Sequence, residues 1–303
     1  SIQLLIVFSS FIPCLNEEKT IKSCIDEAMI GIKNSKFEGE VLVSDNGSTD
    51  NSVSIALENG ARVVSTDLKG YGSAIINGIN NAEGEYVIVG DADMTYDFKE
   101  IPKFIESLEN DFDLVIGNRF KGGIEKGAMP FLNKYLGNPF LSFVARRFFK
   151  INIGDFHCGL RGIKRSVFKN LNLRSTGMEF ASEMIVKAAI MNFKIKEVPT
   201  VLRKPPFPRI PHLKPFRDGF RHLYLIFSHT LVNKNNFLTK VLILLFGSLY
   251  IFLLLLSPIK FEDVEFSSLS LLVTNLLFIF SFSFLKFKIL VRNILLNNLS
   301  QHK

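Results

Sequence analysis

The sequence predicts a Rossmann-like α/β fold, in which a mostly parallel sheet carries helices on both faces, followed by a C-terminal hairpin of two transmembrane helices. Three observations predict it. Over the first two thirds of the chain, short apolar runs alternate with amphipathic stretches, as in a sheet buried on both faces. Polar motifs follow several of these runs where each strand should end, and two long uncharged runs stand near the C-terminus. We therefore divide the chain into residues 1–202, 203–236 and 237–303.

Strands are predicted where apolar residues run without interruption, and helices where they recur at every third or fourth position. The predicted strands are residues 2–12, 40–44, 62–65, 85–89, 113–116 and 193–201. Residues 2–12 lack a basic start and a cleavage site of small residues, so a strand is favoured there over a signal peptide. The predicted helices are 16–32, capped by Asn16, 49–60, capped by Thr49 or Asp50, 69–79, 98–108, 130–149, with a break at Pro139, and 177–191. Residues 155–162 are expected to be a loop or strand that lines a site.

The composition changes at Arg203. Prolines between residues 205 and 215 prevent regular structure, and Arg203, Arg217 and Arg221 belong to a strongly basic stretch. From residue 216 an apolar stripe at helical spacing follows, which predicts an amphipathic helix on a membrane surface. An ordinary surface helix packed on the domain is the alternative.

Residues 241–257 and 266–285 are uncharged runs of about 17 and about 20 residues, enough to span a bilayer. Lysines and arginines flank the outer ends of the pair, and an acidic loop separates the two runs. The positive-inside rule then places the N-terminal domain and both termini in the cytoplasm, in a multi-pass protein with two spans. A buried helical hairpin is the alternative.

Two aspartates, Asp91 and Asp93, follow the buried run 87–90 directly. Carboxylates two residues apart on a chain that leaves its strand can turn toward one ion, and Mg²⁺ or Mn²⁺ prefers such oxygens and shares them with substrate phosphates. Ligands of open α/β sheets bind beyond the carboxyl ends of the strands. The sequence therefore predicts a metal and diphosphate site here, with a solvated acidic turn as the alternative.

Other strand ends supply polar partners for this site. Asn16 and Glu17 follow the first predicted strand and Asp45 the second, so they are expected to meet Asp91 in one crevice. Cations able to meet phosphate oxygens are Lys69, Arg119 and Arg161. The glycine pair in residues 70–72 lacks the third glycine of a dinucleotide fingerprint, which disfavours NAD.

In this order, the motifs in residues 13–18, 45–50, 69–72 and 91–93 resemble those of the glycosyltransferase family 2 domain, which has the GT-A fold. Within that family the chain is similar to membrane-anchored polyprenyl-phosphate glycosyltransferases, such as dolichol-phosphate mannose synthase and its bacterial glucosyl counterparts. Residues 117–120, 155–162 and 179–183 continue the resemblance, which covers residues 3 to about 230. The motifs are specific to the family and much less so to the donor sugar.

The resemblance implies roles for individual residues. The nucleotide would be held by Pro13, Asn16, Glu17, Asp45, Lys69 and Asp91. The metal would be held by Asp91, Asp93 and His157, with Asp93 as the principal ligand. Catalysis would rest on Asp91, Asp93, Arg119 and Arg161, and the lipid phosphate would meet Arg119, Arg203, Arg217 and Arg221. Asn46 departs from the pattern, because many relatives carry a second aspartate there.

The function expected is transfer of a hexose from a nucleotide sugar, of the UDP-glucose or GDP-mannose type, to a polyprenyl phosphate for cell-envelope glycans. The acceptor phosphate is already anionic, so it needs no general base. Membrane lipids are expected partners, nucleic acid is not, and the oligomeric state stays open.

A second hypothesis is transfer to a hydroxyl acceptor. It would need Glu179 or Glu183 as a base, although ion pairs with Lys or Arg are favoured for both. A non-enzymatic, membrane-anchored nucleotide-binding scaffold is the third hypothesis. A processive polysaccharide synthase is disfavoured, because such synthases resemble a pattern with a Gln-x-x-Arg-Trp segment and this chain has no tryptophan.

Overall fold

The computed structural model describes residues 7–207 and 215–232. The chain divides into two compact units, Ser1–Ile226 and Phe227–Lys303, and the described residues belong almost entirely to the first. The predicted spans at 241–257 and 266–285 lie outside the described residues. Within the described part, no helix has the length and apolar character needed to cross a membrane.

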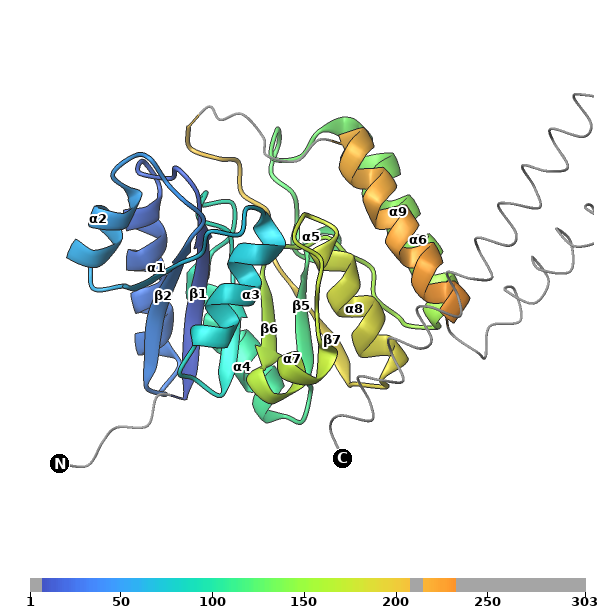
Figure 1. Cartoon of the computed structure of the whole chain (residues 1–303), viewed down its shortest axis with the longest axis horizontal. Helices are drawn as coiled ribbons and strands as arrows, with labels where there is room; N and C mark the ends of the chain where they lie inside the picture. Colours follow the sequence, from blue (N-terminus) through green and yellow to red (C-terminus); the bar gives the residue numbers. More distant parts are fainter. Residues whose placement is uncertain (1–6, 208–214, 233–303) are drawn as a thin grey trace, which may run out of the picture. The chain divides into compact units, whose positions relative to one another are not determined.

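A seven-stranded sheet forms the centre of the first unit, in the order β3-β2-β1-β4-β6-β5-β7 (Figure 1). The strands are β1 Phe8–Cys14, β2 Gly39–Asp45, β3 Arg62–Ser65, β4 Tyr86–Val89, β5 Leu114–Asn118, β6 Arg161–Lys164 and β7 Ile195–Pro199. β6 runs antiparallel to both of its neighbours, β4 and β5, and all other pairs are parallel. The predicted mostly parallel α/β fold is therefore confirmed.

The helices lie close to their predicted positions. They are α1 Ile21–Asn34, α2 Ser52–Glu58, α3 Tyr71–Asn81, η1 Phe98–Glu100, α4 Ile101–Glu109, α5 Arg119–Gly122, η2 Asn133–Gly137, α6 Asn138–Phe149, α7 Arg165–Leu171, α8 Phe180–Ile190 and α9 Pro215–Val232. The short helices α5 and α7 were not predicted. Pro139 stands in the first turn of α6, where its missing N–H costs nothing, and the π-helical turn η2 precedes it.

The prediction that Asn16 caps the first helix is wrong. Asn16 has a left-handed backbone (φ 57°), and α1 begins only at Ile21, after Thr20. Asparagine tolerates this conformation better than most residues, which explains why it can stand in a tight loop after the strand.

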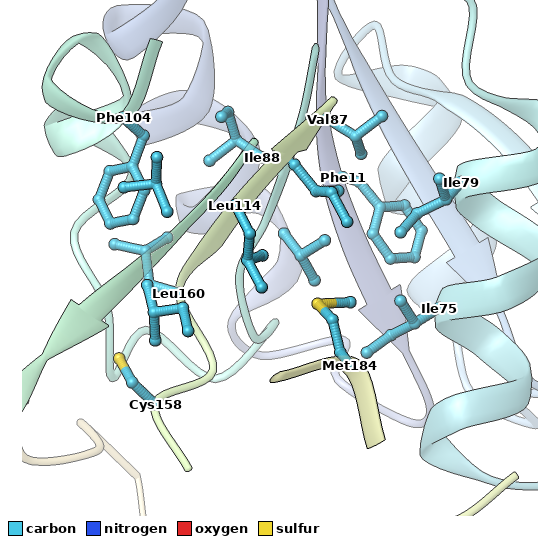
Figure 2. Close-up of a cluster of buried hydrophobic side chains, with 14 of the residues drawn as sticks. Phe11, Ile75, Ile79, Val87, Ile88, Phe104, Leu114, Cys158, Leu160 and Met184 are labelled. Atoms are coloured by element: carbon cyan, nitrogen blue, oxygen red, sulfur yellow. The ribbon is translucent and has the colours of Figure 1, made fainter. Parts of the chain in front are cut away.

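Apolar side chains cover both faces of the sheet. Figure 2 shows Phe11 and Val87 beside Ile79 of α3, whereas Ile88 points to the other side, toward Phe104 of α4. Because strand residues alternate between faces, neighbours such as Val87 and Ile88 fill different layers. The three cysteines, Cys14, Cys24 and Cys158, are buried free thiols.

The strand register brings three strand ends to one edge of the sheet. Cys14 is the register partner of Asp45, and Phe11 is the partner of Val89. The ladder continues one step further, because Gly90 N–H donates to the carbonyl of Phe11 at 3.1 Å. The loops after β1, β2 and β4 therefore leave the sheet side by side, as the sequence predicted.

Candidate active site

The loops after β1 and β2 are fastened to each other. The Asn16 Oδ1 atom accepts a hydrogen bond from the Thr49 N–H at 2.8 Å, and the Asn16 N–H donates to Ser48 Oγ at 2.9 Å. The buried Asp45 carboxylate accepts from the N–H groups of Gly47 and Ser48 at 3.0 and 3.1 Å. Asn16 and Asp45 thus shape this edge, Glu17 follows Asn16 in the same loop, and the half-buried Pro13 lies at the end of β1.

The hydrogen bonds of Asn46 explain why an asparagine stands where many relatives carry an aspartate. Its side-chain amide donates to the carbonyl of Leu68 at 2.7 Å and its Oδ1 accepts from the Gly70 N–H at 2.8 Å. An aspartate could accept here but could not donate. The loop before α3 is held in this way at the end of β2, and the Lys69 ammonium donates to the Asn46 carbonyl at 3.2 Å. A cation therefore stands beside the loop after β2.

Asp91 and Asp93 are both held by neighbouring donors. The Tyr71 hydroxyl donates to Asp91 Oδ1 at 2.9 Å, and the Thr95 N–H donates to Asp93 Oδ1 at 3.0 Å. Burial and the negative charge of Asp91 raise the pKa of Tyr71 far above its usual value, so the hydroxyl keeps its proton. Sequence analysis missed Tyr71, although it lies inside the 69–72 motif.

Asp91 is also in close contact with the loop before β6. A Cβ atom on Gly159 would lie 2.3 Å from Asp91 Oδ2, so any larger residue here would force a shift of the surrounding side chains. The Gly159 N–H donates to the Tyr96 hydroxyl at 2.8 Å. The antiparallel course of β6 brings about this approach, because Arg161 is the register partner of Val89.

A cleft of about 210 Å³, open to solvent, runs past Asp93. Its lining is mainly polar on the side of the β1 and β2 loops and apolar on the side of the proline-rich segment: Asn16, Glu17, Glu18, Lys19, Thr20, Asp50, Asp93, Pro205, Pro206 and Phe207. The proline-rich segment is fixed at its start, because Arg203 pairs with Glu27 at 2.8 Å and with Asp97 at 2.7 Å. Arg203 therefore has carboxylate partners within the domain.

The donor set fits a divalent cation that shares its shell with a substrate. Asp91 and Asp93 offer hard carboxylate oxygens at the edge where ligands of such sheets bind. Among the residues that the structure describes, no three His, Cys, Asp or Glu side chains gather closely enough to hold a metal by themselves. A diphosphate would therefore have to supply further oxygens, which is the usual arrangement for Mg²⁺. The structure does not group His157 with the two aspartates.

Both arginines that were expected to meet phosphates have partners inside the domain. Arg119 is 7% exposed and donates through Nε and Nη2 to the two oxygens of the fully buried Asp155, each at 2.7 Å. Arg161 is 4% exposed and donates to the carbonyl oxygens of Cys158 and Phe156 at 2.7 Å. The two guanidinium groups thus hold the loop 155–160 against the sheet. Asp155 was not singled out from the sequence.

His157 lies in a small cluster with residues from two helices. Its Nε2 is 3.4 Å from Ser182 Oγ of α8, and its ring meets that of His222 of α9 edge to face at 4.5 Å. His222 Nδ1 is 2.8 Å from the same hydroxyl. Burial and the neighbouring His222 lower the pKa of His157 far below its usual value, and burial lowers the pKa of His222 to about 4. His157 Nδ1 is buried without a hydrogen-bond partner.

The two candidate bases differ sharply. Glu183 is enclosed: its carboxylate accepts from the N–H groups of Arg174 and Ser175 at 3.0 and 2.8 Å and pairs with Lys187 at 2.7 Å. Glu179 precedes α8, and its Oε2 atom is buried without a hydrogen-bond partner, 3.8 Å from Arg221. Both therefore stand beside cations, as favoured from the sequence.

The arginines of α9 point outward. The Arg217 side chain is 57% exposed and pairs with the neighbouring Asp218 at 3.0 Å. The Arg221 side chain is 47% exposed. Both keep enough exposure to reach a ligand at the surface. The same helix exposes Phe220 and Tyr224 and buries His222 and Ile226, so its apolar residues are divided between an exposed and a buried side and do not form the single stripe that was predicted.

Comparison with known proteins gives a consistent picture. Residues 9–171 match the family model of glycosyl transferase family 2. The chain is 40% identical to the low-salt glycan biosynthesis hexosyltransferase Agl6 of Haloferax volcanii over 216 residues, which are 71% of this chain and 52% of Agl6. It thus spans about half the length of that relative. It is 34% identical to the glycosyltransferase AglJ of the same organism, over 70% of this chain and 69% of AglJ. Identity to a dolichyl-phosphate hexose transferase of that organism is 30%, over 62% of this chain and 79% of the relative.

Among solved structures, the chain is similar to glucosyl-3-phosphoglycerate synthase from Mycobacterium tuberculosis in complex with Mn²⁺, UDP and glucosyl-3-phosphoglycerate. The TM-score is 0.57 at 20% identity, over 74% of this chain and 80% of the synthase. At this identity the likeness concerns the fold.

Proposed function

The chain belongs to glycosyl transferase family 2 and has its GT-A-like fold, and from this premise we propose that it transfers a hexose from a nucleotide sugar to a polyprenyl phosphate at a membrane. The state of Glu183 carries the proposal. Its carboxylate is held by two backbone N–H groups and by Lys187, so it is a poor proton acceptor for a substrate hydroxyl. An acceptor that brings its own negative charge avoids the need for a base.

Two relatives support parts of this proposal. One is named a dolichyl-phosphate hexose transferase, which supports the acceptor class, and another a glycan biosynthesis hexosyltransferase, which supports transfer of a hexose. The apolar runs at 241–257 and 266–285 would keep the enzyme at the membrane, with the catalytic domain on the cytoplasmic side, where such a lipid can reach it.

On the donor side, we assign the nucleotide to the fastened loops after β1 and β2, with Pro13, Asn16, Glu17 and Asp45 around the nucleoside. Lys69 would meet a phosphate. Asp91 and Asp93 would hold Mg²⁺ or Mn²⁺, which neutralises charge on the departing diphosphate. The hydrogen bonds from Tyr71 and Thr95 orient these carboxylates before the substrate arrives.

On the acceptor side, an oxygen of the lipid phosphate attacks the anomeric carbon, the bond from that carbon to the diphosphate oxygen breaks, and the nucleoside diphosphate leaves. We assign the exposed cations Arg217 and Arg221 to the incoming phosphate. Arg119 and Arg161 serve this step by holding the loop 155–160 beside Asp91, because their guanidinium groups are bonded within the domain.

A second candidate is transfer to a hydroxyl acceptor. One observation favours it: the Glu179 Oε2 atom is buried and has no hydrogen-bond partner, as a base awaiting a substrate proton would be. Glu179 is therefore the residue that separates the two functions.

The test is transfer of label from a panel of radiolabelled nucleotide sugars to undecaprenyl or dolichyl phosphate, in membranes with Mg²⁺ or Mn²⁺ and with EDTA. Metal-dependent label in the lipid fraction that persists in Glu179→Gln is the expected result. Donor turnover without a lipid product, abolished by Glu179→Gln but not by Glu183→Gln, would replace the proposal with the hydroxyl-acceptor function. Neither turnover nor transfer with any donor would overturn both.

A further inference from the structure

The segment η2–α6 exposes an unusual concentration of large apolar side chains. Six residues of this segment and the turn before it are between 51% and 73% exposed, and together they form what we call the η2–α6 face: Phe131, Leu132, Tyr135, Leu136, Phe140 and Phe143. The other large apolar side chains that are exposed in the described chain are spread over many elements. Scattered exposed apolar residues need no explanation, but a contiguous patch usually marks an interaction site.

The patch is one side of an amphipathic segment whose other side is anchored. Ser142, Ala145 and Phe149 of α6 are buried, and Ser142 Oγ accepts a hydrogen bond from the Phe156 N–H at 3.3 Å. α6 also packs against α8. The exposed residues recur at helical spacing on the opposite side, so the fold holds this face outward.

The segment that carries this face has charged residues of one sign. Residues 126–154 contain five cations and no Asp or Glu: Lys126, Lys134, Arg146, Arg147 and Lys150. Arg147 and Lys150 continue the exposed side of α6 beyond Phe143, so the stripe passes from aromatic to basic. An apolar face rich in aromatic residues, on a segment whose charged residues are all cations, is typical of a helix that lies in the headgroup region of an anionic membrane.

We infer that the η2–α6 face docks on the surface of an anionic membrane leaflet, with its aromatic and leucine side chains among the acyl-chain ends and its cations at the lipid phosphates. A second copy of the chain is a poorer occupant, because a two-fold contact would set this cationic segment against itself. The inference deepens the proposed function and rests on it for the presence of a membrane beside the catalytic domain. It adds a second contact, far in sequence from α9 and from the apolar runs after it.

The chain contains no tryptophan, so one introduced tryptophan reports on its own position. Phe140→Trp and Phe143→Trp in the full chain place the probe on the face. Leu57→Trp is the matched control, because Leu57 is an equally exposed apolar residue (57%) on α2. Each variant is reconstituted in vesicles of phosphatidylglycerol and phosphatidylcholine, with and without bromine atoms on the acyl chains, and tryptophan emission is recorded.

The expected result is that Phe140→Trp and Phe143→Trp emit at shorter wavelength in vesicles and lose most of their emission to brominated lipid, whereas Leu57→Trp does neither. Arg147→Gln combined with Lys150→Gln should weaken the quenching most at low phosphatidylglycerol content. Emission at both positions like that of Leu57→Trp would overturn the inference. So would blue-shifted but unquenched emission, since this would show that protein covers the face, from residues 233–303 or from a second copy. Because the readout needs no turnover, these failures are distinct from failure of sugar transfer.

Discussion

The two sides of the site are built differently. On the side that we assign to the nucleotide, polar side chains at the ends of β1 and β2 are held by backbone N–H groups of short neighbouring loops, as Asp45 is by Gly47 and Ser48. On the side that we assign to the acceptor, buried charged side chains are bonded to one another or to carbonyl groups, as Arg119 is to Asp155. The first arrangement leaves polar atoms at an open cleft, whereas the second uses charge to hold a loop in place.

This difference shows that burial determines whether a charged side chain positions the backbone or remains available to bind a ligand. A guanidinium that is 7% exposed and bonded to both oxygens of a carboxylate acts on substrate only through the backbone that it positions. An arginine such as Arg217, with more than half of its side chain exposed, keeps donors for a ligand. The comparison makes separate predictions for stability and for catalysis.

The largest effect on stability is expected from breaking the buried ion pair between Arg119 and Asp155. Arg119→Met leaves the Asp155 carboxylate buried without its charge partner, which should lower the free energy of unfolding by about 3–5 kcal/mol. Thermal unfolding of the purified protein measures this loss. Arg62→Met is the matched control: Arg62 also meets both oxygens of a carboxylate, Glu40, at 2.8 and 3.0 Å, but its side chain is 37% exposed. Its loss should cost about 1 kcal/mol or less. Equal costs would show that the two sides do not differ in this way.

The next largest effect is expected on the rate of sugar transfer, with no change in stability. Asp93→Asn keeps an oxygen that can accept from Thr95 but removes the negative charge, so sugar transfer should fall by at least about 100-fold while the melting temperature stays unchanged. Label in the lipid product measures the transfer. Asp67→Asn, at an exposed loop position, is the control and should retain activity. Substantial transfer by Asp93→Asn would remove the metal assignment.

The features of this protein that its sequence predicts are those that depend on residues close together in the chain. Alternating apolar runs predicted the sheet, and polar motifs directly after three runs predicted the edge of the sheet from which the loops after β1, β2 and β4 leave. The motif order also identified the family correctly. These features depend on residues within a few positions of each other and on the common direction of parallel strands.

What the sequence did not reveal depends on distant partners. Asp155 lies 36 residues from Arg119, and His222 lies 40 residues from Ser182, so no spacing rule joins them. The antiparallel course of β6 likewise follows from its fit between β4 and β5. A lone Arg or His in a sequence does not tell whether it faces a ligand or a buried carboxylate.

Gly159 is where the loop 155–160 contacts Asp91, and its substitution tests whether this loop positions Asp91. The expected effect is smaller than those above. Gly159→Ala places a Cβ atom 2.3 Å from Asp91 Oδ2 and 2.9 Å from the Tyr96 ring, so one of them must shift. We expect a loss of about 1–3 kcal/mol in unfolding free energy and a clear fall in transfer rate. Gly219→Ala is the control, since a Cβ there meets open space. Full activity in Gly159→Ala would show that the loop 155–160 does not position Asp91.

The smallest effect that we expect is the change with pH of the contribution of Glu183 to the free energy of unfolding. Burial alone would raise the pKa of Glu183, but the Lys187 ammonium and the N–H groups of Ser175 and Arg174 outweigh it and hold the pKa below the usual value of 4.5. A carboxylate whose pKa is lower in the folded state stabilises the fold above the pKa of the unfolded chain and loses this contribution as pH falls through the folded value.

Glu183→Gln should therefore lower the free energy of unfolding by about 1–3 kcal/mol at neutral pH, since it weakens hydrogen bonds to a buried charge. The gap between wild type and variant should stay constant down to the usual pKa of Glu and then narrow in more acidic solution, because the wild-type carboxylate becomes protonated. Thermal unfolding of both proteins over that pH range measures the gap. A gap that widens on acidification would mean that the folded protein raises this pKa, and Glu183 would then return as a candidate base.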